Sequence, residues 1–120
     1  MAKTILIVDD SATMVMSVKT TLEMNGFKVE TATDGVIALD KLKGGLKPDL
    51  IITDINMPEM NGLTFLRELS RSHPDSNVIM VTAYGEVESY IEAMNLGAFE
   101  YINKPVKIDE LKKIIGKIFN

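Results

Sequence analysis

The segment LIVDDSAT, residues 6–13, joins the end of an apolar run to two adjacent carboxylates. The run is continuous from Ile5 to Val8 and ends at Asp9 and Asp10. A continuous aliphatic run is typical of a strand that is covered on both faces in a parallel sheet. Because neighbouring negative charges repel each other, the acidic pair predicts a positive charge that the local sequence does not supply.

Further short apolar segments follow, separated by apolar residues at helical spacing. We expect five strands, at Thr4–Val8, Lys28–Ala32, Leu50–Thr53, Val78–Val81 and Glu100–Ile102. In the first interval, Val15, Val18 and Leu22 recur at helical spacing, and Gly26 follows as a typical helix stop. This alternation predicts right-handed crossovers and a doubly wound (βα)5 fold of the α/β class, a five-stranded parallel sheet with helices on both faces.

Length and composition limit the kinds of protein that this chain can be. The 120 residues fit one domain, 1–120, with a single core. The chain has no Cys, which excludes disulfides and thiolate chemistry and fits a cytoplasmic location. The net charge of −4 argues against direct nucleic-acid binding. The apolar run at the N-terminus is too short to span a membrane.

Polar residues follow four of the five predicted strands. They are Asp9 and Asp10 after the first, Asp54 after the third, Thr82 after the fourth and Lys104 after the fifth. Because the carboxyl ends of parallel strands share one edge, where ligands bind, we expect these side chains to converge. Three carboxylates form a hard-oxygen site suited to Mg²⁺, which keeps waters that a phosphate can replace. A metal ion is therefore the predicted missing charge.

Several motifs surround these residues: IVDD at 7–10, DLIITDINMPEMNG at 49–62, VTAYG at 81–85 and YINKP at 101–105. Together they make the chain resemble the receiver domains of the two-component response-regulator family, especially the single-domain chemotaxis-type members. The resemblance extends from Ile5 to the last predicted helix. It implies a flavodoxin-like fold with strand order 2-1-3-4-5, and it locates residues 57–62 beside the site.

The resemblance also implies a set of metal ligands. Asp10 would bind Mg²⁺ directly and Asp9 would bind it through water. The carboxylate of Asp54 and the main-chain carbonyl of Asn56 would complete the protein's share of the ligands. A bound Mg²⁺ would neutralise charge during phosphoryl transfer.

Asp54 is, by the same resemblance, the residue that accepts a phosphoryl group from a histidine kinase or a phosphotransfer protein. A carboxylate can form an acyl phosphate when its oxygen is held in line with the donor. Thr82 and Lys104 would bind the phosphoryl oxygens, since both donate hydrogen bonds. Pro105 would follow Lys104 through a cis peptide bond. The chain would not be an enzyme, although it would assist its own phosphorylation and dephosphorylation.

Thr82 and Tyr101 match the family's switch pair. Phosphorylation would draw the Thr82 hydroxyl toward the new oxygens, and Tyr101 would fill the vacated space. The fourth helix, fifth strand and fifth helix would then change their affinity for a downstream protein. The expected function is a phosphorylation-dependent signalling switch that binds neither nucleic acid nor membrane.

Three alternatives stay open. The stretch TAYGEVESYIEAMNLGAFEYINKP, residues 82–105, also resembles receivers attached to transcription activators, so the chain can be the receiver of a longer transcriptional regulator. A Mg²⁺-dependent aspartyl-phosphate phosphatase would need a second carboxylate two residues after its nucleophile, where this chain has Asn56. A flavodoxin-like binding domain would need a glycine-rich or hydroxyl-rich loop after the first strand, which is lacking.

Overall fold

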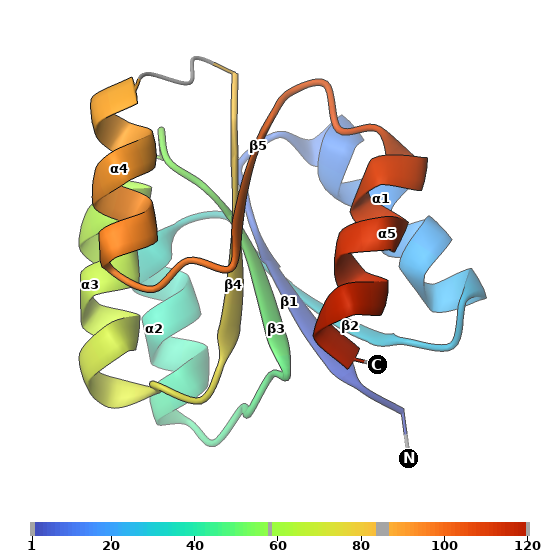
Figure 1. Ribbon diagram of the computed structural model, residues 1–120. Helices are drawn as coiled ribbons and strands as arrows, with labels where there is room; N and C mark the ends of the chain where they lie inside the picture. The colour runs from blue at the N-terminus through green and yellow to red at the C-terminus, as the bar shows by residue number, and fades with distance from the viewer. Residues whose placement is uncertain (1, 58, 84–86, 120) are drawn as a thin grey trace.

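The computed structural model describes residues 2–57, 59–83 and 87–119, in which five strands alternate with five helices (Figure 1). The strands are β1 (Thr4–Val8), β2 (Lys28–Ala32), β3 (Leu50–Asp54), β4 (Asn77–Thr82) and β5 (Glu100–Asn103). The helices are α1 (Ala12–Met24), α2 (Gly35–Lys43), α3 (Gly62–Ser72), α4 (Val87–Asn95) and α5 (Ile108–Phe119). The strands form one sheet of order β2-β1-β3-β4-β5, and every neighbouring pair is parallel. The predicted fold class and strand order are confirmed.

All five predicted strands are present, and three are longer than predicted. β3 continues to Asp54, β4 runs from Asn77 to Thr82, and β5 ends at Asn103. The added residues take part in the same ladders, since Asp54 pairs with Val81 and Thr82 pairs with Asn103. Each of these two added pairs therefore brings at least one polar residue to this edge of the sheet.

Helices cover both faces of the sheet, with α2, α3 and α4 on one face and α1 and α5 on the other (Figure 1). Alternate residues of β1 serve the two faces: Leu6 and Val8 belong to one buried cluster, and Ile5 and Ile7 belong to the other. Because every residue of the strand meets a helix layer, the run has to be continuously apolar. The sheet thus divides the buried apolar residues into two clusters, rather than the single core that the chain length suggested.

The carboxyl ends of the strands meet at one edge of the sheet. The ladder extends beyond β1, where the Asp9 N–H donates to the Ala32 carbonyl at 3.0 Å. It also extends beyond β5, where the Lys104 N–H donates to the Thr82 carbonyl at 2.7 Å. These backbone hydrogen bonds fix Asp9 relative to the last residue of β2 and Lys104 relative to the last residue of β4.

Local signals in the sequence match several helix ends. Gly26, the predicted stop of α1, has a φ of +90°, which glycine adopts without strain. The Asn61 side chain caps α3 by accepting a hydrogen bond from the Thr64 N–H at 2.9 Å. None of the helices within the described ranges has the length and hydrophobicity needed to cross a membrane. Pro58, in the predicted loop 57–62, and Tyr84 and Gly85, in the VTAYG motif, lie outside the described residues.

We expect Phe65 to carry much of the fold's stability, because it is a fully buried aromatic side chain in α3. Phe65→Ala should lower the free energy of unfolding by about 3–5 kcal/mol, through lost burial and the cavity left behind. Phe99→Ala is the matched control, since that ring is 39% exposed, and should cost about 1 kcal/mol. Urea denaturation measures both values, and equal losses would contradict the assignment.

Candidate functional site

Three carboxylates converge at the carboxyl edge of the sheet. One oxygen from each of Asp9, Asp10 and Asp54 lies within 4.8 Å of the others. Asp9 and Asp54 are buried, whereas Asp10 is exposed. The predicted convergence of these three residues is therefore observed, and the cluster is accessible to solvent on the side of Asp10.

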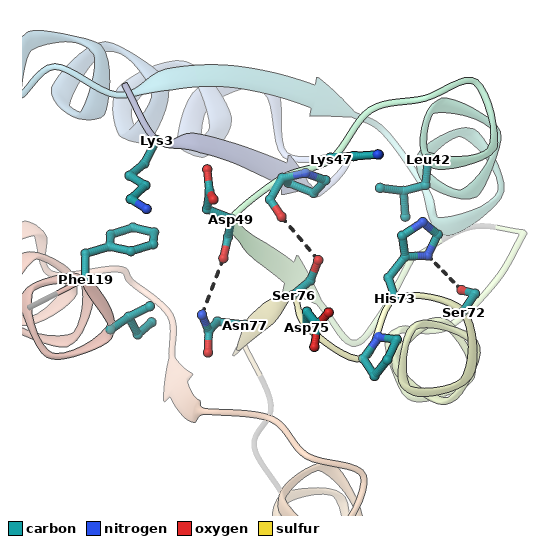
Figure 2. A pocket seen from close by; sticks show the side chains of 13 residues that line it. Lys3, Leu42, Lys47, Asp49, Ser72, His73, Asp75, Ser76, Asn77 and Phe119 are labelled. Atoms are coloured by element: carbon teal, nitrogen blue, oxygen red, sulfur yellow. Dashed lines mark hydrogen bonds between the residues drawn. The ribbon is translucent and has the colours of Figure 1, made fainter. Parts of the chain in front are cut away.

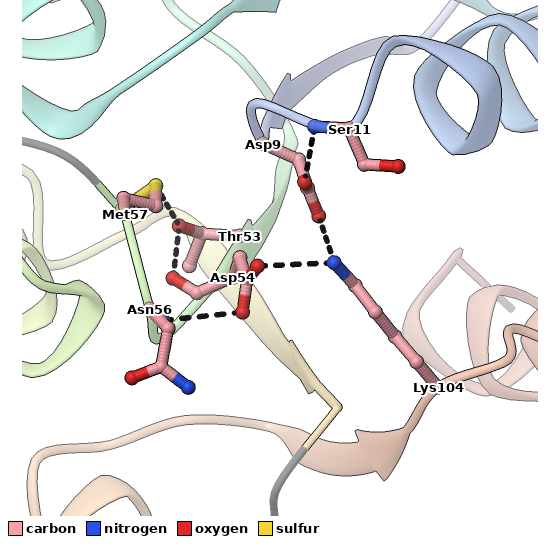
Figure 3. Close-up of polar contacts among 7 residues, drawn as sticks. All are labelled: Asp9, Ser11, Thr53, Asp54, Asn56, Met57 and Lys104. Carbon is pink, nitrogen blue, oxygen red and sulfur yellow. Dashed lines mark hydrogen bonds and ion pairs between the residues drawn. The ribbon is translucent and has the colours of Figure 1, made fainter.

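Lys104 provides a positive charge between the two buried carboxylates. Its Nζ lies 2.9 Å from Asp9 Oδ2 and 3.0 Å from Asp54 Oδ2 (Figure 3). Burial disfavours the charged ammonium, yet the pKa of Lys104 is raised above its ordinary value, because its hydrogen bonds and ion pairs with the two carboxylates outweigh that cost. The side chain stays charged and reduces the repulsion between Asp9 and Asp54.

Backbone amides orient the other oxygen of each buried carboxylate. Asp9 Oδ1 accepts a hydrogen bond from the Ser11 N–H at 2.8 Å, and Asp54 Oδ1 accepts one from the Asn56 N–H at 3.2 Å (Figure 3). In both cases the amide belongs to the residue two positions further along the chain. The carboxylates therefore have fixed orientations before any ligand binds.

The donor set fits a hard divalent cation. Three carboxylates and one ammonium leave an excess of negative charge. Asp9 Oδ2 is buried, and the contact that the described residues give it is the 2.9 Å one with Lys104 Nζ. A cluster with this excess of negative charge favours a further cation nearby. Closely spaced carboxylates beside solvent are ligands of the kind that Mg²⁺ uses.

The remaining predicted residues lie around this cluster. Thr82 is fully buried at the end of β4, and the Lys104–Pro105 peptide bond is cis, the isomer that the resemblance implies. Tyr101 lies on β5, and its hydroxyl oxygen is already buried in this structure. Asn56 is exposed and its N–H points to Asp54, so the chain at residue 56 borders the carboxylate cluster.

Sequence reasoning missed two contributors. The Ser11 amide orients Asp9, and the signal was available, because an Asp side chain in a turn commonly accepts a hydrogen bond from the backbone N–H two residues further on. The ring of Tyr90 on α4 meets that of Tyr101 edge-on, with 5.5 Å between ring centroids and 85° between planes. No local pattern in the sequence predicts the contact between Tyr90 and Tyr101, because it joins side chains of different elements.

A hollow of about 620 Å³ lies at the opposite edge of the sheet, where the strands begin (Figure 2). Its polar groups largely bond to one another. Ser76 Oγ donates to the Pro48 carbonyl at 3.2 Å, and Asn77 Nδ2 contacts the Asp49 carbonyl at 3.5 Å. His73, the only histidine, shares a 2.8 Å hydrogen bond with Ser72. Unlike the acidic cluster, this hollow holds no concentration of charge of one sign.

The balance of charge at the cluster can be tested by changing it in both directions. Lys104→Met leaves Asp9 and Asp54 without their counterion. It should lower the free energy of unfolding without Mg²⁺ by about 1–3 kcal/mol, less than for a fully buried pair because Lys104 is 19% exposed. Mg²⁺ should then raise the melting temperature more than in the parent protein, since it supplies the lost charge.

Asp10→Asn is the opposing variant. It should stabilise the metal-free protein by relieving repulsion and should shrink the response to Mg²⁺, because a ligand is lost. Thermal unfolding over a range of Mg²⁺ concentrations measures both variants. If both keep the parent protein's Mg²⁺ response, the cluster is not the cation site.

Comparison with known proteins agrees with this geometry. The sequence model of the family described as response regulator receiver domain matches residues 5–116 of this chain. Chemotaxis protein CheY of Bacillus subtilis is 41% identical over 121 residues, which cover the full length of both chains. Regulatory protein AtoC of Escherichia coli is 40% identical over 94% of this chain, but the match spans only 24% of AtoC.

The same relationship is found in three dimensions. The crystal structure of a CheY-like receiver domain protein from Methanospirillum hungatei matches with a TM-score of 0.91 and 37% identity, covering 98% of this chain and 94% of that one. This similar structure, the observed order of the strands and the full-length relative from Bacillus subtilis all indicate the same family. The chain belongs to the response regulator receiver domains, the signalling domains of two-component systems.

Proposed function

We propose that the chain, as one receiver domain of residues 1–120, is a phosphorylation-dependent switch and that Asp54 accepts the phosphoryl group. The observation that carries this proposal is the setting of the Asp54 carboxylate. It is buried at the end of β3, the central strand of the sheet, with one oxygen on the Asn56 amide and the other on Lys104. An oxygen held in this way meets the main requirement for attack in line with a leaving group.

Mg²⁺ is the proposed cofactor. Asp10 would bind it directly, Asp9 through water, and the Asp54 carboxylate and Asn56 carbonyl would complete the ligands from the protein. When bound, it would neutralise charge on the transferring phosphoryl group. The excess negative charge of the cluster and the buried Asp9 Oδ2 support this assignment.

The donor would be a phosphohistidine of a histidine kinase or a phosphotransfer protein. An Asp54 oxygen attacks phosphorus, the P–N bond breaks, and the imidazole leaves with its electron pair. Formation of the acyl phosphate removes the negative charge that Asp54 shared with Lys104. The ammonium, which has three donors, can then bind a phosphoryl oxygen while it keeps Asp9, and Thr82 adds a hydroxyl donor.

The product of this reaction stays on the protein, so the chain acts as a phosphoacceptor rather than as an enzyme with a separate substrate. Asn56 supports this assignment over a phosphatase, because an amide cannot serve as the acid or base that a second carboxylate would supply. The match to part of AtoC keeps open the alternative of a receiver within a longer regulator.

The proposed output surface comprises α4, β5 and α5. Tyr90 and Ile91 on α4, and Phe99 just before β5, expose much of their apolar side chains. Exposed apolar side chains grouped on neighbouring elements favour a protein partner. Tyr101 lies beneath this surface against Tyr90, so a change in its ring packing reaches α4 directly. Because its hydroxyl is already buried, phosphorylation would increase the population of a packing that is present beforehand.

The assignment of Asp54 predicts that incubation with Mg²⁺ and a small acyl phosphate, or with a cognate kinase, adds one phosphoryl group to the chain. Intact mass spectrometry measures the gain. Asp54→Asn should abolish it, because the amide is a much weaker nucleophile. Asp75→Asn is the control, since this exposed carboxylate lies at the other edge of the sheet, and it should label normally. Undiminished labelling of Asp54→Asn would move the acceptor elsewhere.

The proposed switch pair, Thr82 and Tyr101, predicts that a substitution can uncouple phosphorylation of Asp54 from the response of Tyr101. Beryllofluoride with Mg²⁺ mimics a phosphoryl group and should shift the NMR signals of the Tyr101 ring. Thr82→Ala should weaken that shift while phosphorylation of Asp54 continues, because the hydroxyl that links them is gone. Thr82→Ser keeps a hydroxyl and should retain the shift. Tyr101 signals that ignore the mimic in the parent protein would refute the coupling.

A further inference from the structure

We infer that Gly62 is a positioning residue for the phosphoacceptor. The absence of a side chain at this residue lets the first turn of α3 pack directly on the backbone of Asp54 and Ile55. This inference rests on the proposed function of Asp54. It adds the requirement that residue 62 has no side chain, which is separate from the proposed metal ligands and phosphate-binding side chains.

The contact is made between backbones. The Gly62 N–H donates a hydrogen bond of 2.6 Å to the Ile55 carbonyl, and Gly62 is buried. A Cβ atom on Gly62 would lie 2.7 Å from Ile55 Cα, 2.9 Å from the Asp54 carbonyl carbon, and closer still to the Asp54 carbonyl oxygen. None of these atoms can rotate out of the way, because all of them belong to the main chain of Asp54 and Ile55.

The lack of room for a side chain, rather than the backbone conformation, explains why residue 62 is a glycine. Gly62 is not among the described glycines that have a positive φ, so an alanine could adopt its backbone angles. At Gly35, a Cβ would approach Met60 Sδ at 3.1 Å, and that side chain is flexible. At Gly116, in α5, a Cβ would meet nothing within 4 Å. The obstruction at Gly62 is therefore a property of this position.

The Asp54 peptide is held from two sides. Thr53 Oγ1 donates a hydrogen bond to the Asp54 carbonyl at 3.1 Å (Figure 3), and Gly62 packs against the same carbonyl. The segment that leaves this peptide includes the Asn56 amide, which orients the Asp54 carboxylate. The main-chain carbonyl of Asn56 is also a proposed Mg²⁺ ligand. A displacement of the peptide would thus move both the reacting carboxylate and a metal ligand.

The distance by which the two backbones must separate in Gly62→Ala determines the expected loss in phosphorylation rate. A Cβ at 2.7 Å from Ile55 Cα reaches ordinary van der Waals contact only if the backbones separate by at least about 0.7 Å, and the closer Asp54 carbonyl oxygen requires more. A misplacement of about 1 Å at a reacting group can cost about 100-fold in rate. We therefore expect Gly62→Ala to slow phosphorylation of Asp54 by about 10- to 100-fold at saturating Mg²⁺.

The test compares Gly62→Ala with Gly116→Ala, the same substitution in open space. Circular dichroism and the melting temperature establish that each variant is folded. Three readouts follow: the phosphorylation rate with a small acyl phosphate at saturating Mg²⁺, the Mg²⁺ dissociation constant, and the NMR signals of the Ile55 and Asn56 amides. Gly62→Ala should slow the reaction, weaken Mg²⁺ binding and shift both amides, whereas Gly116→Ala should leave all three as in the parent protein.

If Gly62→Ala does not fold, Asn61→Ala provides an independent test without adding atoms. It removes the cap that holds the start of α3, and it should slow phosphorylation several-fold. Asn61→Ser keeps a capping oxygen and should restore the rate.

The possible failures are distinguishable. A folded Gly62→Ala variant that reacts and binds Mg²⁺ like the parent protein overturns the positioning role and leaves Asp54 as the acceptor. A parent protein that is never labelled overturns the proposed function. The positioning role is then judged on the Mg²⁺ dissociation constant and the two amide signals.

Discussion

The ion pairs of Lys104 with Asp9 and Asp54 are the contacts on which the rest of the site depends. Two carboxylates of like charge are buried side by side at the ends of β1 and β3, an arrangement that is unfavourable without a counterion. Lys104 supplies that counterion from the end of β5, which is separated from β3 by β4. The same contact therefore stabilises the acidic cluster and draws three strand ends together.

The two edges of the sheet differ in how their polar groups are satisfied. At the edge where the strands begin, Asp49 accepts a hydrogen bond from the Thr4 N–H at 2.8 Å, and Ser76 bonds to Pro48. At the carboxyl edge, three carboxylates face one ammonium among the described residues, so the charges do not balance. Functional sites tend to lie where charged groups are left without full compensation, so the hollow at the opposite edge is not the candidate site.

The strands and the convergence of Asp9, Asp54 and Lys104 could be predicted, because each strand carries its own apolar signal and parallel strands share an edge. The resemblance added the strand order. What local patterns could not give is packing between elements: the division of the core by the sheet, the contact of Tyr90 with Tyr101, and the fit of Gly62 against Asp54. Such contacts depend on where whole elements meet, and no local period in the sequence records them.

The backbone offers a route from the proposed acceptor, Asp54, to the proposed output surface. Lys104 bonds through its N–H to the Thr82 carbonyl and through its side chain to Asp54, so it belongs to the ladder and to the site at once. Tyr101 lies three residues before it on β5. If phosphorylation removes the charge that holds Lys104 to Asp54, the forces on the end of β5 change together with those on Thr82. Two linked contacts then bias one aromatic ring, which is how a local change in charge can select between two packings without a long chain of intermediates.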